Sequence, residues 1–158
     1  MVKKIVVILL AVLLITTVNE AAAVDGVTDT AVSIGISTPL SGPAALWGMS
    51  GLGAKAWADY INDKGGIHGR KINVILRDDG YNPARALANL TAMKGDVFSV
   101  TALLGVAGVR ATRDFLAENK IPLILPLYTP RLWENYSQDK KPWVFSTYPD
   151  TIDEAGFL

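Results

Sequence analysis

Short apolar runs alternate with amphipathic segments along most of the chain. The apolar runs are rich in β-branched side chains, which predicts strands at 32–38, 71–78, 98–104 and 122–126. The apolar residues between them recur at helical spacing, which predicts helices at 49–64, 83–94 and 108–120. Strands that alternate with helices favour right-handed crossovers and a parallel sheet. The predicted fold class is therefore α/β, with a doubly wound parallel sheet.

Residues at the ends of the helical segments support these boundaries. Gly65 and Gly66 end the first helix, because glycine adopts the left-handed conformation at low cost. Asn82 fits the N-cap of the second helix, and Pro83 fits its first helical position. The apolar stripe of the first helix consists of Leu52, Ala56 and Tyr60, with Met49 and Ile61 beside them. In the third helix, Phe115 and Leu116 are expected to face the sheet, together with Ile121.

The last thirty residues depart from this alternation. Residues 143–148 predict one more strand, and Thr151 with Glu154 fits a capping box for a helix that begins at about Asp150. That helix reaches Leu158 after a few residues, and a helix so short buries little surface. We therefore expect the sequence to stop inside a longer fold.

The first 23 residues have the pattern of a secretory signal. Two lysines precede an unbroken apolar run over residues 5–15, and three alanines at 21–23 close the segment. A membrane-spanning helix needs about 20 apolar residues, so this run is too short to be an anchor. We expect cleavage after Ala23, an extracytoplasmic (periplasmic) location, and no stable membrane insertion afterwards.

Composition excludes most catalytic and metal chemistry. The 158 residues include 15 basic and 15 acidic side chains, so the basic excess of a nucleic-acid-binding protein is absent. There is no cysteine, and the single histidine, His68, cannot form a histidine cluster for a metal. His68 lies in a glycine-flanked reversal without an acidic partner at a suggestive spacing, so surface packing is favoured over catalysis. We expect no enzyme activity, no metal, no cofactor and no nucleic-acid partner.

Two polar patterns have ordinary structural explanations. Gly48, Gly51 and Gly53 follow a strand, but their spacing is not that of a dinucleotide-binding loop, so close helix packing is favoured. Asp78 and Asp79 end a strand, where adjacent side chains point to opposite faces. A solvated turn is therefore favoured over a convergent carboxylate pair.

The candidate binding site lies at the carboxyl end of the predicted sheet, where open parallel sheets bind ligands. The loops at that end are 39–48, 105–110 and 127–133. The second loop leads directly into a helix, whose free backbone N–H groups suit a carboxylate or phosphate. Trp47 in the first loop, and Tyr128 with Thr129 in the third, are predicted to line a pocket.

Five segments of the mature chain are distinctive in combination. In order they are DGVTDT from Asp25, IGISTPLSGPA from Ile34, INDKGGIHGRKI from Ile61, RDDGYNPARA from Arg77 and IPLILP from Ile121. Together they resemble the extracytoplasmic substrate-binding proteins of branched-chain amino acid ABC transporters, the leucine-binding-protein-like members of the type I periplasmic-binding family. The resemblance implies two α/β lobes, joined by three crossovers, that close on a ligand without chemistry.

The resemblance also implies site residues. The matching ligand-binding positions are Trp47, Ala107, Gly108, Val109, Tyr128 and Thr129. Tyr148 and Asp150 fall at the first crossover between the lobes. Where the family commonly has Ser or Thr, this chain has Val109. The ligand's carboxylate would therefore be held by backbone donors, or by a charge-assisted bond from Arg110.

The implied organisation is a signal peptide (1–23), a first α/β lobe (24–147), and the first crossover with the start of a second, truncated lobe (148–158). The implied function is the solute-binding component of an ABC transporter. It would bind a branched-chain or related amino acid, or a small amide-like solute, and deliver it to permease subunits. An exported ligand-sensing module of a receptor or regulator with the same fold is the alternative. An exported enzyme is disfavoured because no nucleophile and base converge.

Overall fold

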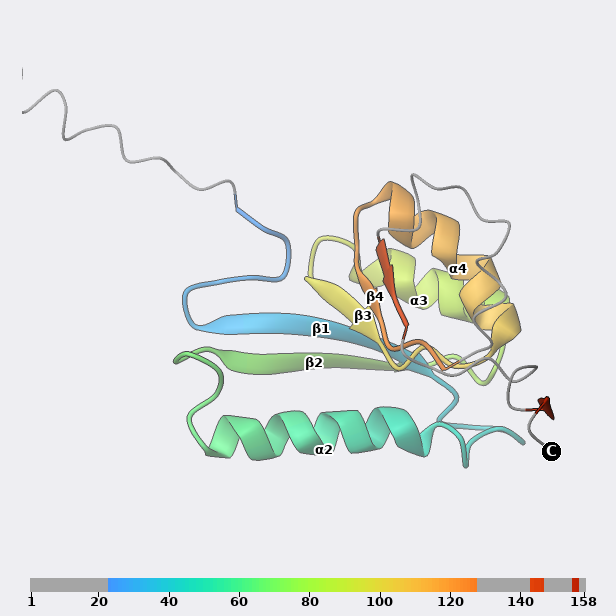
Figure 1. Ribbon diagram of the computed structural model, residues 1–158, viewed down its shortest axis with the longest axis horizontal. Coiled ribbons are helices and arrows are strands. Elements are labelled where there is room, and N and C mark those ends of the chain that lie inside the picture. Colours follow the sequence, from blue (N-terminus) through green and yellow to red (C-terminus); the bar gives the residue numbers. More distant parts are fainter. Residues whose placement is uncertain (1–22, 128–142, 147–154, 157–158) are drawn as a thin grey trace, which may run out of the picture.

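Strands and helices alternate through residues 23–127, 143–146 and 155–156, the part of the chain that the computed structural model describes (Figure 1). The strands are β1 (Ala31–Thr38), β2 (Lys71–Asp78), β3 (Ser99–Thr101), β4 (Leu123–Ile124) and β5 (Val144–Phe145). The helices are α2 (Met49–Asp63), α3 (Pro83–Met93) and α4 (Val106–Glu118). The predicted alternation is confirmed. The strands β3 and β4 are shorter than their apolar runs, and α4 begins at Val106 rather than Gly108.

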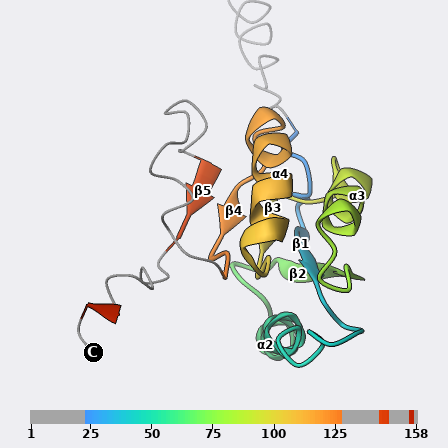
Figure 2. The same cartoon turned by 90° about the vertical axis from the view of Figure 1, so that its right-hand side faces the viewer.

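The sheet is parallel and has the strand order β2-β1-β3-β4-β5. The strand β1 pairs with β2 along its whole length, from Ala31 opposite Lys71 to Thr38 opposite Asp78. The chain therefore moves one way across the sheet from β1 to β2, and the other way from β2 to β5. Right-handed crossovers then place α2 on one face and both α3 and α4 on the other (Figures 1 and 2). This arrangement is the predicted doubly wound sheet.

Helix α2 packs against the sheet through small residues. A side-chain carbon added at Gly51 would lie 2.7 Å from Cγ2 of Thr38 and 3.1 Å from Cγ2 of Ile36, so only glycine fits without displacement. Ala58 is the other buried residue of this helix. Of the three glycines expected to allow close helix packing, Gly51 therefore does so against the sheet. The expectation is wrong for Gly53, where an added side-chain carbon would meet no atom within 4 Å.

The larger apolar residues of α2 lie away from the sheet. Leu52 and Tyr60 are 40% and 50% exposed, and Ala56 between them is also exposed. The periodicity correctly groups these residues on one side of the helix, but that side faces outward. The fully buried residues of α2 are the small Gly51 and Ala58, and Ile61 is half-buried, whereas the other bulky apolar residues of the helix face solvent.

The main hydrophobic core lies on the other face of the sheet, under α3 and α4. Its buried residues are Leu90, Met93, Val97, Val100, Leu103, Val109, Leu116, Ile121 and Leu123. Leu116 and Ile121 thus face the sheet as predicted, and Phe115 packs against the same cluster. Gly35 of β1 allows close packing here, because a side-chain carbon at that position would lie 3.0 Å from Sδ of Met93.

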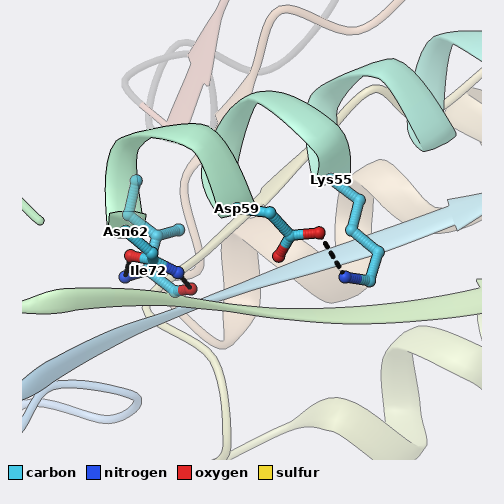
Figure 3. A network of polar contacts seen from close by, with 4 residues as sticks. All are labelled: Lys55, Asp59, Asn62 and Ile72. Atoms are coloured by element: carbon cyan, nitrogen blue, oxygen red, sulfur yellow. Dashed lines mark hydrogen bonds and ion pairs between the residues drawn. The ribbon is translucent and has the colours of Figure 1, made fainter. Parts of the chain in front are cut away.

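Two asparagine side chains fix the ends of helices. Asn82 accepts hydrogen bonds from the N–H groups of Ala84 and Arg85 at 2.9 and 3.0 Å, which confirms the predicted N-cap of α3. Near the end of α2, Asn62 bonds the backbone of Ile72 in β2 (Figure 3). Its Oδ1 accepts from the Ile72 N–H at 2.7 Å, and its Nδ2 donates to the Ile72 carbonyl at 2.8 Å.

Asp78, the last residue of β2, holds the loop that follows β1. Its Oδ2 accepts from the hydroxyl of Ser41 at 2.5 Å, and its Oδ1 accepts from the N–H groups of Leu40 and Gly80, both at 2.8 Å. These hydrogen bonds, the one from Ser41 foremost, lower the pKa of Asp78 to about 2. The ionised carboxylate therefore stabilises the connection between two neighbouring strand ends.

Leu90→Ala is expected to lower the free energy of unfolding by about 2–5 kcal/mol, because it deletes a fully buried side chain and leaves a cavity. Leu52→Ala, the same change on the exposed side of α2, is expected to cost less than about 1 kcal/mol. Urea denaturation followed by circular dichroism measures both values. Equal losses would contradict the orientation of α2.

Asp78→Asn is expected to remove part of the acid sensitivity of the fold. The pKa of Asp78 is about 2 in the folded chain and 3.8 ordinarily, so protons bind the unfolded chain first. Its stabilising contribution is therefore complete above about pH 4 and is lost as the pH falls towards 2. The urea midpoint measured across that range should fall less steeply in the variant than in the unaltered chain. Identical pH profiles would show that the carboxylate is not held as described.

Candidate functional site

Three segments meet at the carboxyl end of the sheet: the loop after β1, the turn after β2 and the start of α4. The last two enclose a cavity of about 10 Å³, which is room for about one water molecule. Its lining consists of Asp79, Tyr81, Asn82, Ala86, Leu104, Ala107 and Gly108. The structure thus brings the predicted residues Ala107 and Gly108 together with the β2–α3 turn.

The first turn of α4 supplies backbone donors to this site. Its N-cap, Gly105, has φ 85° and ψ 150° and makes no side-chain capping bond. The first hydrogen bond of the helix runs from the N–H of Val109 to the carbonyl of Gly105 at 3.0 Å. The N–H groups of Val106, Ala107 and Gly108 precede that bond, so they are available to an acceptor at the positive end of the helix dipole. A carboxylate or phosphate suits this position.

The side chain of Val109 does not reach the site. It is fully buried and belongs to the main core. Arg110, beside it, has an exposed side chain. The side chain of Val109 is therefore unavailable to a ligand, which leaves the backbone of this stretch and the exposed Arg110 as the two sources of donors that the sequence predicts.

Tyr81 is a residue of the site that the sequence reasoning missed. Its ring meets that of Trp47 edge-on, with centroids 6.0 Å apart and planes at 68°. It also lies directly over Gly105, where an added side-chain carbon would come within 2.6 Å of the Tyr81 hydroxyl oxygen. Tyr81 has φ 62°, an uncommon conformation for a residue other than glycine. The two aromatic rings, 60% and 43% exposed for Trp47 and Tyr81, form an apolar corner beside the start of α4.

The carboxylate of Asp79 links the turn at Tyr81 to strand β1 by hydrogen bonds. Its Oδ1 accepts from the N–H of Tyr81 at 2.8 Å, and its Oδ2 accepts from the hydroxyl of Ser37 at 2.9 Å. Asn89 in turn donates to the Ser37 hydroxyl oxygen at 3.2 Å. Burial raises the pKa of Asp79, although these two hydrogen bonds oppose the shift. The expectation of a solvated turn is wrong for Asp79, which is 3% exposed because Ser37 of β1 lies against it.

The remaining sequence predictions divide by location. Asp78 and Asp79 bind different partners, so the two carboxylates do not converge, as expected. His68 is exposed in the reversal before β2, at the opposite end of the sheet from the site. The four predicted positions Tyr128, Thr129, Tyr148 and Asp150 lie outside the described residues.

The described residues contain neither a candidate metal cluster nor a membrane-spanning helix. They hold no group of three or more His, Cys, Asp or Glu side chains suited to a metal ion. Among the same residues, no helix has both the length and the apolar character needed to cross a membrane.

Comparison with known sequences identifies relatives. The sequence profile of a periplasmic binding protein family matches residues 31–156. The Leu/Ile/Val-binding protein BraC3 of Rhizobium johnstonii is 34% identical over 100 residues, which are 62% of this chain and 27% of that protein. The profile match therefore covers all five described strands of the sheet.

Solved structures show the same fold. A fatty acid ABC transporter substrate-binding protein from Thermomonospora curvata aligns with a TM-score of 0.73 and 26% identity, over 85% of this chain and 34% of that one. The branched-chain amino acid transporter substrate-binding protein LivJ from Streptococcus pneumoniae, solved with isoleucine, aligns with a TM-score of 0.64 and 25% identity, over 77% of this chain and 34% of that one. The chain thus spans about a quarter to a third of the length of these proteins. The family profile matches most of the chain, and the solved structures share its parallel sheet. The chain therefore belongs to the periplasmic binding protein family and has the type I fold that its five sequence segments indicate.

Proposed function

We propose that this chain forms the first lobe of the solute-binding component of an ABC transporter, and that the lobe binds a branched-chain or related amino acid. One observation carries the proposal: the free N–H groups at the start of α4 lie beside the corner formed by Trp47 and Tyr81. Backbone donors at a helix N-terminus suit the ligand's carboxylate. The exposed faces of the two rings suit an aliphatic side chain.

The relatives support this class of ligand. The names of these relatives refer to leucine, isoleucine and valine, to branched-chain amino acids, or to fatty acids. Each of these ligands combines a carboxylate with an aliphatic chain. The site described above has groups for both parts of such a molecule. Identity of 34% to the Leu/Ile/Val-binding protein favours an amino acid.

Enclosure of the ligand requires a second surface. The cavity of about 10 Å³ holds about one water molecule, whereas small-molecule sites bury most of the ligand in a far larger volume. In the proposed mechanism a second lobe closes over the ligand by a hinge motion, with Tyr148 and Asp150 at the first crossover. Tyr128 and Thr129 add contacts from the first lobe. The loaded protein then delivers the solute to permease subunits outside the cytoplasm, after cleavage of the signal behind Ala23.

The purified 158-residue chain is expected to bind leucine, isoleucine and valine weakly or not at all. Calorimetric titration up to about 1 mM ligand, which detects binding free energies stronger than about −4 kcal/mol, measures this. Micromolar affinity of the chain alone would show that a second lobe is not needed.

A chimera tests the site itself. Residues 24–158 would replace the matching segment of the Rhizobium johnstonii relative, whose remainder supplies the missing surface. Saturable binding of leucine is expected, and Trp47→Ala should weaken it about threefold to tenfold, because an aromatic contact is worth about 0.5–1.5 kcal/mol. Trp57→Ala, which removes an exposed tryptophan of α2, is the matched control and should leave Kd unchanged.

Two outcomes of the chimera experiment test the ligand class and the position of the ligand separately. A folded chimera that binds no branched-chain amino acid would overturn the ligand class. Equal Kd values for the Trp47→Ala and Trp57→Ala chimeras would move the ligand away from the aromatic corner.

A further inference from the structure

Tyr81 presents its hydroxyl to the start of α4, a feature that the aliphatic contact proposed above does not use. A side-chain carbon added at Gly105 would lie 2.6 Å from the Tyr81 hydroxyl oxygen, 2.7 Å from Cε2 and 2.9 Å from Cζ. The hydroxyl therefore rests against the backbone of Gly105, which is the N-cap of α4. The N–H groups available to an acceptor begin with the next residue, Val106.

Contacts on several sides hold the tyrosine in this position. Oδ1 of Asp79 accepts a hydrogen bond from the N–H of Tyr81 at 2.8 Å, and the next residue, Asn82, caps α3. The ring of Trp47 meets the Tyr81 ring edge-on, at a centroid distance of 6.0 Å. A side chain that is fixed in this way loses little conformational freedom when it contacts a ligand.

The small cavity of the site contacts both the tyrosine and the helix. Its lining includes Tyr81, from the turn after β2, and Ala107 and Gly108, from the first turn of α4. Tyr81 is 43% exposed, so a molecule that approaches the start of α4 from solvent also reaches the tyrosine. The hydroxyl and the free N–H groups can therefore face a common acceptor.

A carboxylate is an acceptor that can use both kinds of donor at once. Its two oxygens offer about four acceptor positions, and its hydrogen bonds are shorter and stronger than those of a neutral acceptor. The first turn of α4 supplies backbone donors, because the side chain of Val109 is buried in the core. The Tyr81 hydroxyl adds a side-chain donor from a neighbouring element.

We propose that the Tyr81 hydroxyl donates a hydrogen bond to the carboxylate of the ligand and thereby fixes the orientation of the ligand. This contact belongs to the site of the proposed function and rests on it. The carboxylate lies between the hydroxyl and the start of α4, and the aliphatic part lies against the ring faces of Trp47 and Tyr81. Where the family commonly has a hydroxyl, at the position of Val109, this chain supplies one from a different element.

Arg110 is the competing side-chain donor. Its side chain is exposed on α4, and a long exposed side chain must be ordered before it can hold a ligand. Tyr81 is already held by its neighbours, and a tyrosine has few rotatable bonds to restrict. The contacts of the two side chains therefore favour Tyr81.

The chimera described above tests this contact, because it completes residues 24–158 with the remainder of the relative. Tyr81→Phe deletes only the hydroxyl oxygen and keeps the ring beside Trp47. Calorimetric titration should show leucine binding weakened about tenfold to a hundredfold, as expected for the loss of a hydrogen bond to a charged group. Tyr60→Phe makes the same deletion at an exposed tyrosine of α2 and should leave Kd unchanged.

A second ligand identifies the group that the hydroxyl contacts. Leucinamide replaces the carboxylate of leucine by a neutral amide, and competition with leucine measures its affinity. Tyr81→Phe should reduce the preference for leucine over leucinamide by about tenfold, because the charge-assisted bond is made only to leucine. Circular dichroism and urea denaturation identical to those of the unaltered chimera show that each variant is folded.

Four results would overturn the proposal. A chimera that binds no leucine would overturn the ligand class and this contact together. Equal Kd values for the Tyr81→Phe and Tyr60→Phe chimeras would overturn the contact alone. An unchanged preference for leucine over leucinamide would place the hydroxyl against another part of the ligand. Weaker binding in Arg110→Gln without any loss in Tyr81→Phe would assign the carboxylate to Arg110.

Discussion

The right-handed crossover between parallel strands is the constraint on which the rest of the structure depends. The chain moves from β1 to β2 and then back across the sheet to β3, so handedness alone separates α2 from α3 and α4. Because the strand order changes direction between β1 and β3, the loops that follow these two strands lie on opposite faces of the sheet. Space is therefore left between the loops at the carboxyl ends of the strands. Trp47, Tyr81 and the first turn of α4 meet there. The layers and the position of the site therefore have one cause.

Local signals were sufficient to predict the elements. The span of β2 and the N-cap Asn82 follow from β-branched residues, a strand-ending turn and an Asn-Pro pair, all of which act within a few residues. Burial was harder to predict. Leu103 is fully buried although it lies after β3, so the apolar run marks burial rather than strand length. The outward orientation of α2 depends on how closely Gly51 approaches β1, which periodicity does not reveal.

The location of the candidate site at the carboxyl end of the sheet follows from chain order. Trp47, Ala107 and Gly108 lie at the expected end of the sheet because every strand there runs in the same direction. Tyr81 was missed, and the burial of Asp79 was predicted wrongly, because the surroundings of both residues come from distant parts of the chain. The ring of Tyr81 rests on Gly105, and the carboxylate of Asp79 is covered by Ser37. Neither contact has a local signature.

The bond between Asn62 and β2 has a consequence for solubility. The strand β2 ends the sheet on one side, and an outer strand offers unpaired backbone groups to any other extended chain. The side-chain amide of Asn62 occupies both the N–H and the carbonyl of Ile72, as a neighbouring strand would (Figure 3). At Ile72, helix α2 thereby blocks intermolecular strand addition, and the exposed cations Lys71 and Arg77 of β2 disfavour it along the same border of the sheet.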